Sequence, residues 1–258
     1  MAARHTDLDS HLQHPVPRPK DRTKPTRHSV TRTCNVNLKA CVSTPMPHEL
    51  LQRNREWAAS QDPSFFEALT EGQSPRFLWI SCSDSRVPAN EIVECHPGDL
   101  FVHRNIANRI DHDDLNGLSV LEYAVEVLQV PHIVVCGHYQ CGGIKAAMEH
   151  TDHGLIDNWL RPIKRCYHQH HDELDRITDD HKRWDRLCEL NVIDQVEGIA
   201  STTVVQKAWQ RGHEVTIHGW IYQLANGEIH DLGVEVDSPD QVPPIYRISA
   251  SSSALGDA

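Results

Sequence analysis

Apolar positions between residues 47 and 236 follow two repeating patterns. Short runs of apolar and β-branched residues, typical of buried strands, occur at 77–80, 100–103, 133–137, 215–221 and 229–234. Stretches with apolar residues every three or four positions, which indicate amphipathic helices, occur at 47–61, 63–70, 114–129, 158–168 and 187–211. Because strands and helices alternate, the sequence predicts an α/β fold: a mainly parallel central β-sheet flanked by helices on both faces.

The two ends of the chain lack these patterns. Residues 1–45 are rich in Pro, Thr and His and carry eight basic against three acidic residues, so we expect a disordered basic extension. Because this segment contains no Glu, an organelle presequence is the second interpretation. Residues 46–238 are predicted to form one folded domain, and residues 239–258, rich in Ser, Pro and Ala, a flexible C-terminal tail. The charged stretch 170–183 is expected to be exposed.

Side chains that could bind a metal ion come directly after two of the predicted strands. Cys82 comes just after the run at 77–80, and His138 and Cys141 follow the run at 133–137. Two thiolates and one imidazole suit zinc, and three protein ligands leave the fourth tetrahedral position for water. The sequence therefore predicts a catalytic zinc site, with one zinc per chain, at the carboxyl edge of the sheet, where open α/β sheets bind ligands.

Asp84 and Arg86 stand two and four positions after Cys82. In an extended segment these three side chains project to the same side, so Asp84 can reach both a zinc-bound water and the guanidinium of Arg86. An isolated C-x-D-x-R pattern fits equally well an Asp that caps a turn, with the Arg exposed. The later H-x-x-C pattern, placed after a second strand, favours the metal site.

With these residues the chain resembles the β-class carbonic anhydrases, whose zinc and dyad signature is C-x-D-x-R followed by H-x-x-C. The likeness runs from about Pro47 to about Val236 and includes Phe101–Asn105 and Glu189–Val192. It implies zinc ligands at Cys82, His138 and Cys141, a catalytic dyad of Asp84 and Arg86, and reversible hydration of carbon dioxide to bicarbonate and a proton. Residues 46–238 would then be the zinc-dependent catalytic domain.

The resemblance also implies a possible switch. In some β-class enzymes the dyad Asp turns onto zinc as a fourth ligand, and bicarbonate stabilises this closed state in a pocket formed by a Trp, an Arg and a Tyr. Trp79, Arg104 and Tyr222 match those three positions. Ser81 departs from the pattern, since regulated members commonly carry Gly before the first zinc cysteine, and its side chain would disfavour the closed backbone.

Two other functions compete with carbon dioxide hydration. A related zinc hydrolase of carbonyl sulfide or carbon disulfide would use the same attack by zinc-bound hydroxide. The other alternative is a noncatalytic protein in which a structural zinc only stabilises the fold, although such a site needs no Asp–Arg dyad. The proton shuttle is left open: His103 is one candidate, and a packed strand histidine is an equal interpretation of that residue.

Partners and compartment follow from composition and from the resemblance. No apolar run approaches the roughly 20 residues that span a bilayer, so we expect a soluble protein without membrane contact. A net charge of −11 and a basic segment confined to the first residues argue against nucleic acid. The cysteine pattern favours a reducing, cytoplasmic location, with a mitochondrion or other organelle as the alternative. The family implies a homodimer or tetramer.

Overall fold

The computed structural model describes residues 45–249, and these form two units, one ending at Ala59 and one beginning at Ser60. The described part of the first unit is helix α1 (Pro47–Ala59), in which no residue is buried. The second unit contains the sheet and all other helices of the described segment. No helix of residues 45–249 combines the length and apolar character that crossing a membrane requires. The predicted extension lies, up to residue 44, outside the described residues.

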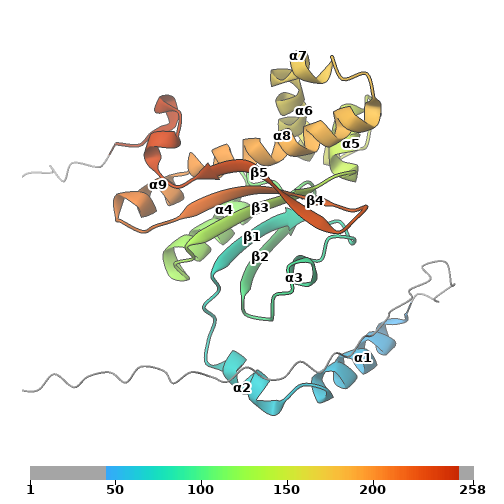
Figure 1. Ribbon diagram of the computed structural model, residues 1–258, viewed down its shortest axis with the longest axis vertical. Coiled ribbons are helices and arrows are strands. Elements are labelled where there is room, and N and C mark those ends of the chain that lie inside the picture. Colours follow the sequence, from blue (N-terminus) through green and yellow to red (C-terminus); the bar gives the residue numbers. More distant parts are fainter. Residues whose placement is uncertain (1–44, 250–258) are drawn as a thin grey trace, which may run out of the picture. The chain divides into compact units, whose positions relative to one another are not determined.

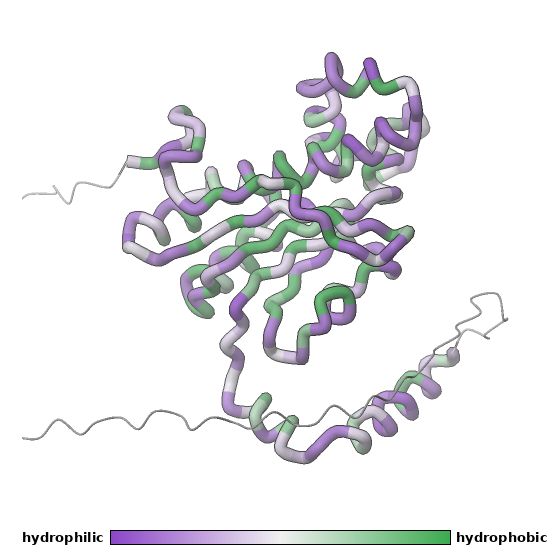
Figure 2. The backbone as a smooth tube through the Cα atoms, in the orientation of Figure 1, coloured by the Kyte–Doolittle hydropathy of each residue, from purple (hydrophilic) through white to green (hydrophobic). Residues whose placement is uncertain are grey.

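The sheet has five strands in the order β2-β1-β3-β4-β5 (Figure 1). Strands β1 (Phe77–Cys82), β2 (Leu100–Asn105), β3 (His132–His138) and β4 (Thr216–Gln223) are parallel, and β5 (Glu228–Val236) pairs antiparallel with β4. The hydropathy colouring shows apolar residues concentrated in the central strands (Figure 2). The mainly parallel α/β fold predicted from the sequence is confirmed.

Helix α2 precedes β1, and the later helices occupy the connections between β1 and β4. Their bounds are α2 Pro63–Thr70, α3 Ala89–Ile92, α4 Leu115–Glu122, α5 Gly142–Met148, α6 Ile156–Gln169, α7 His171–Leu174, α8 Asp180–Ala200 and α9 Thr203–Gln210. Side chains that cap the following helix explain several starts: Asp62, Asp114 and Asp179 each accept a hydrogen bond from a backbone N–H of the first turn.

Three sequence expectations need correction. The helix predicted at 187–211 is broken, because the side chain of Thr202 accepts from Val205 N and starts α9 as a separate helix. The helix predicted at 114–129 continues after α4 as a π-helix, Tyr123–Val127. The charged stretch 170–183 is exposed at many positions but contains the fully buried Leu174.

The start of the predicted C-terminal tail is held against α9. Residues 239–249 contain two short 3-10 turns, Pro239–Gln241 and Pro244–Tyr246. The side chain of Gln206 donates to Tyr246 O at 2.9 Å and accepts from Ile248 N at 2.9 Å. These contacts give the described part of the tail a defined path. Residues from 250 onward lie outside the described segment.

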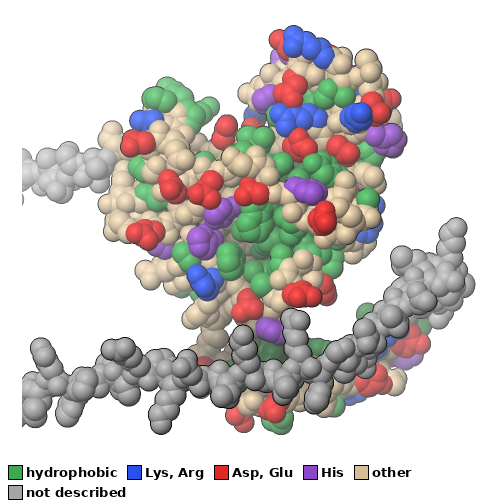
Figure 3. Space-filling view, viewed as in Figure 1, with side chains coloured by type: hydrophobic (Ala, Val, Ile, Leu, Met, Phe, Trp, Pro, Cys, Tyr) green, Lys and Arg blue, Asp and Glu red, His purple; other side chains and the backbone are tan. Residues whose placement is uncertain are grey.

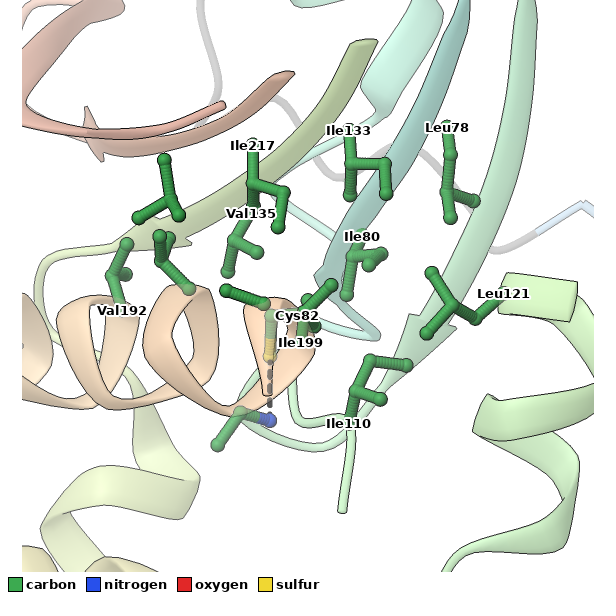
Figure 4. Close-up of a cluster of buried hydrophobic side chains, with 14 of the residues drawn as sticks. Leu78, Ile80, Cys82, Ile110, Leu121, Ile133, Val135, Val192, Ile199 and Ile217 are labelled. Carbon is green, nitrogen blue, oxygen red and sulfur yellow. Dashed lines mark hydrogen bonds between the residues drawn. The ribbon is translucent and has the colours of Figure 1, made fainter. Parts of the chain in front are cut away.

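The two faces of the sheet are covered unequally. The main core lies between one face and the helices α4, α5, α6, α8 and α9, and it includes Leu78, Ile80 and Ile133 (Figure 4). The other face carries a small cluster around Trp79, Val134 and Cys136, over which only α3 contributes a buried helical residue, Ala89. Hydrophobic side chains gather over the strands in the space-filling view (Figure 3). The expectation of helices on both faces therefore holds for one face and only marginally for the other.

Gly137 allows α8 to approach the end of β3. A Cβ atom at this position would lie 2.5 Å from Val192 Cγ2 and 3.3 Å from Ile221 Cδ1. We expect Gly137→Ala to lower the free energy of unfolding of the metal-free protein by about 1–3 kcal/mol, because the core there has no room. Gly198→Ala is the matched control: its Cβ meets nothing within 4 Å, and helix propensity predicts a gain of up to about 1 kcal/mol. Equal effects in urea denaturation would contradict this account.

Candidate metal centre and catalytic site

Parallel pairing of β1 with β3 places the predicted metal-binding side chains together. Ser81 pairs with Cys136, so both strands end at the same edge of the sheet. Cys82 is the last residue of β1, His138 is the last residue of β3, and Cys141 is the N-cap of α5. One ligand atom from each of the three lies within 4.8 Å of the others, and all three residues are buried. Such a group of two sulfurs and one nitrogen fits a zinc ion.

The orientation of the His138 ring is suited to metal binding. Its Nδ1 lies 2.9 Å from Tyr139 O, and because a carbonyl oxygen only accepts, Nδ1 carries the hydrogen. The lone pair is therefore on Nε2, which is buried and has no hydrogen-bond partner in the described residues. A buried nitrogen acceptor without a donor is costly in a protein that lacks an ion there. The arrangement matches the usual one, in which the second ring nitrogen is fixed by an acceptor.

The two sulfur atoms of the group lie close together. Cys82 Sγ and Cys141 Sγ are 3.9 Å apart, and a shared hydrogen bond joins them. This hydrogen bond lowers the pKa of Cys82 and raises the pKa of Cys141, which burial raises further. One thiol thus ionises readily while the second keeps its proton. Both sulfurs become thiolates only where a positive ion lies between them.

A strained loop supports the first sulfur. Ala107 N donates to Cys82 Sγ at 3.4 Å (dashed line in Figure 4). Ala107 and Asn108 both have positive φ, 64° and 48°, which is uncommon for residues other than glycine. The carbonyl of Ala107 accepts from Asn191 Nδ2 on α8 at 3.0 Å. Strain of this kind is found where the surrounding structure holds a functional site. Neither residue was identified from the sequence.

Helix α8 also holds the turn between His138 and Cys141. Trp184 Nε1 donates to Cys141 O at 2.9 Å, and Tyr139 Oη donates to Glu189 Oε1 at 2.6 Å. Gln140, at the middle of the turn, has a φ of 55°. The orientation of the ligand turn therefore depends on side chains that lie more than forty residues later in the chain. Sequence reasoning missed these contacts, although Glu189 belongs to a stretch that matched the family.

Asp84 and Arg86 form the predicted pair beside the three ligands. Arg86 Nε and one of its terminal nitrogens donate to the two carboxylate oxygens of Asp84, at 2.9 and 2.7 Å. These hydrogen bonds hold the pKa of Asp84 well below its usual range, so the carboxylate is ionised at neutral pH. Asp84 Oδ2 lies 3.8 Å from His138 Nε2. The carboxylate is therefore beside the ligand atoms but is held by Arg86.

The three residues of the predicted bicarbonate pocket share one face of the sheet. Trp79 and Tyr222 belong to the same apolar cluster, and Arg104 pairs in register with Ser81. Arg104 donates to Cys82 O at 2.8 Å and to Asp84 O at 2.6 Å. Trp79 Nε1 is buried without a hydrogen-bond partner among the described residues, and so is the hydroxyl of Ser81. Arg104 thus holds the backbone on both sides of Ser83.

An open cavity leads to the site. Its volume is about 370 Å³, and Cys82, Asp84, Gly142 and His153 are among the residues that line it. A larger hollow of about 1100 Å³ shares Ser83, Ile106 and Ile156 with it. A small linear molecule has room to reach Asp84 and the sulfur of Cys82 through this cavity.

The structure also shows where His103 and the cysteines outside the candidate metal group lie. His103 is buried, and its Nε2 lies 3.1 Å from Asn105 Nδ2. Cys136 is buried in the small cluster, and burial raises the pKa of its thiol to about 12. None of the six cysteines in residues 45–249 forms a disulfide.

Comparisons with known proteins agree with this site. Residues 77–229 match the family model described as carbonic anhydrase. A carbonic anhydrase of Emericella nidulans is 46% identical over 211 residues, which cover 80% of this chain and 92% of the relative. A tetrameric β-carbonic anhydrase of Sordaria macrospora superposes with a TM-score of 0.69 at 42% identity, covering 73% of this chain and 98% of that one. A Coccomyxa β-carbonic anhydrase in complex with acetazolamide gives a TM-score of 0.72 at 33% identity, with coverage of 76% and 90%. The chain belongs to the β class of the carbonic anhydrase family, as its C-x-D-x-R and H-x-x-C motifs and its parallel sheet indicated.

Proposed function

We propose that this chain catalyses the reversible hydration of carbon dioxide to bicarbonate and a proton. The observation that carries the proposal is the buried group of Cys82, His138 and Cys141, with the ion pair of Asp84 and Arg86 beside it. We propose zinc as the cofactor, one per chain, held by those three side chains. Bound there, zinc supplies a Lewis acid that makes water nucleophilic near neutral pH.

Asp84 and Arg86 have separate roles in this proposal. Asp84 is an ionised acceptor, so it takes a hydrogen bond from the attacking water and turns a lone pair of that water towards carbon dioxide. Arg86 supplies two parallel hydrogen bonds that fix the direction of the carboxylate. Because Arg86 also donates to Gln140 O at 3.5 Å, the pair is connected to the second ligand segment.

Stopped-flow hydration of carbon dioxide, run beside hydrolysis of carbonyl sulfide and carbon disulfide, tests the substrate. We expect fast carbon dioxide hydration and slow or no reaction with the sulfur compounds. The reverse ranking would assign the chain to the hydrolases. Because the similar β-carbonic anhydrase of Sordaria macrospora is tetrameric, we propose a homodimer or tetramer for this chain as well. The cytoplasmic location, or an organelle reached through residues 1–45, stays a prediction.

Removal of a ligand should remove the metal. We expect Cys82→Ser, His138→Ala and Cys141→Ser each to bring the zinc content well below one per chain and to abolish hydration, because two remaining ligands hold zinc weakly. Cys136→Ala is the control, since this buried cysteine lies outside the ligand group. Metal analysis of the purified proteins checks the expectation. Near-full zinc and activity in Cys141→Ser would disprove the ligand assignment.

Changes in the Asp84–Arg86 pair should spare the metal and remove the chemistry. Asp84→Asn replaces the ionised acceptor, and Arg86→Ala frees the carboxylate, yet neither removes a ligand. We expect both variants to retain zinc and to lose about 100-fold or more in kcat/KM. Arg86→Lys should recover only part of the loss, because an ammonium group cannot form the two parallel hydrogen bonds. Wild-type kcat/KM in either of the first two variants would contradict the assigned roles.

We further propose that Asp84 can leave Arg86 and turn towards the ligand atoms, closing the site. Its Oδ2 already lies 3.8 Å from His138 Nε2. Bicarbonate held by Trp79, Arg104 and Tyr222 would favour the closed state by binding it more tightly than the open one. The unpaired Trp79 Nε1 supports a role for this pocket as an anion site.

This switch predicts a pH profile of activity steeper than one ionisation allows, with inhibition by added bicarbonate beyond product competition. Tyr222→Phe and Trp79→Phe should weaken the pocket and make the profile shallower. Ser81→Gly should make it steeper, because it removes the side chain that disfavours the closed backbone. A wild-type profile that fits a single ionisation, without bicarbonate inhibition, would show that this chain stays open.

A further inference from the structure

We propose that Asn191 is a positioning residue of the metal site: it holds the loop 105–110 so that the backbone N–H of Ala107 stays on the sulfur of Cys82. The inference rests on the proposed function, because it concerns how the first ligand of the proposed zinc ion is held. Asn191 is not one of the three ligands and does not line the catalytic cavity. Its influence on the site would therefore pass through the loop.

The loop is hydrogen-bonded directly to the segment of the first ligand. Ala107 N donates to Cys82 Sγ at 3.4 Å (dashed line in Figure 4), and Ser83 N donates to Asn105 O at 2.8 Å. A backbone N–H that points at a thiolate stabilises the negative charge of the sulfur and lowers its electron donation to a metal ion. The position of this N–H therefore affects how tightly the site holds a metal and how acidic that metal is.

Two glycines let the loop lie against the segments of the other two ligands. A Cβ atom at Gly137, the residue before the second ligand, would lie 3.5 Å from Asn108 Oδ1. A Cβ atom at Gly143, two positions after the third ligand, would lie 2.7 Å from Ile106 Cγ2 and 3.4 Å from Ala107 Cβ. The loop is thus next to all three ligand segments, and a change in its path would be transmitted to each of them.

The conformation of the loop needs support from outside. The positive φ angles of Ala107 and Asn108, 64° and 48°, are costly for residues with a side chain. Helix α8 supplies support at two points one turn apart. Asn191 Nδ2 donates to Ala107 O at 3.0 Å, and Gln195 Oε1 accepts from Ile110 N at 2.8 Å. Among the described side chains, Asn191 is the one that bonds to the backbone oxygen of Ala107.

The amide of Asn191 is explained by this one hydrogen bond. The residue is 1% exposed, and its Oδ1 is buried without a hydrogen-bond partner among the described residues. A leucine would fill a similar volume without an unpaired oxygen, so packing alone does not account for an amide here. Because the carbonyl oxygen of Ala107 only accepts, the NH2 group has to face it. The donor is therefore the feature of the side chain that the site uses.

Zinc affinity and the spectrum of the cobalt(II)-substituted protein test the assignment. Asn191→Leu removes the donor and keeps the approximate volume. We expect the Kd for zinc, measured by competition with a chelator, to rise about 10- to 100-fold. The sulfur-to-cobalt charge-transfer band should move to longer wavelength, because a thiolate that loses its N–H donor gives up electrons more readily. Neither measurement depends on hydration of carbon dioxide.

Gln206→Leu is the matched control. Gln206 is also 1% exposed, and its amide holds backbone as well, that of the tail at Tyr246 and Ile248. Its replacement should lower stability in urea and leave zinc affinity and the cobalt band unchanged. Ala107→Gly tests the route of the effect, since it keeps the N–H and suits a φ of 64°. In this background we expect Asn191→Leu to weaken zinc binding less than it does in the wild type.

Wild-type zinc affinity and an unmoved cobalt band in Asn191→Leu would overturn the proposal. An equal loss of zinc affinity with and without Ala107→Gly would also overturn it, and so would the same loss in Gln206→Leu, because Asn191 would then act through general stability. If Asn191→Leu does not fold, Asn191→Ser, whose hydroxyl is too short to reach Ala107 O, replaces it in each comparison with the same expected results. A wild-type chain that binds no zinc would instead refute the proposed function.

Discussion

Two sulfur atoms 3.9 Å apart in a buried site are the constraint on which the rest of the structure depends. Two unit charges at this separation repel by about 4 kcal/mol even at an effective dielectric constant of 20. The protein brings Cys82 and Cys141 together because β1 and β3 are parallel neighbours and end at the same edge. It offers the sulfur of Cys82 a backbone N–H from Ala107, and it offers the pair a neutral imidazole from His138. The zinc ion proposed for this site would balance the charge of the two sulfurs, and its binding would then contribute to the stability of the fold.

Neutralisation of the ion by two thiolates has a chemical consequence. A metal held by two anionic sulfurs is a weaker Lewis acid than one held by three neutral imidazoles. With such a ligand set, activation of water would depend more on a neighbouring hydrogen-bond acceptor. Asp84, held ionised by Arg86, is suited to the acceptor role proposed for it. The segment after β1 therefore carries both the first proposed ligand, Cys82, and the proposed dyad.

Sequence patterns predicted the strands, most helices and the ligand group, because each depends on residues close together in the chain. The apolar runs that form β1 and β3 are local signals, and the ligands follow them directly. The contacts that hold the ligand turn are not local: Trp184 and Glu189 reach Cys141 and Tyr139 from helix α8. The positive φ angles of Ala107 and Asn108 have no sequence signal, since neither residue is a glycine. The break at Thr202 was missed because the apolar spacing continues across it.

Positioning the attacking water and removing a proton place opposite demands on a side chain. A group that positions the attacking water, the role proposed for Asp84, has to keep its charge and its direction while the site is open, and the two hydrogen bonds from Arg86 favour both. A group that removes a proton has to change its charge in every cycle and be exposed to buffer. Those demands exclude each other in a single carboxylate, because the ion pair that fixes Asp84 also makes it a poor proton carrier.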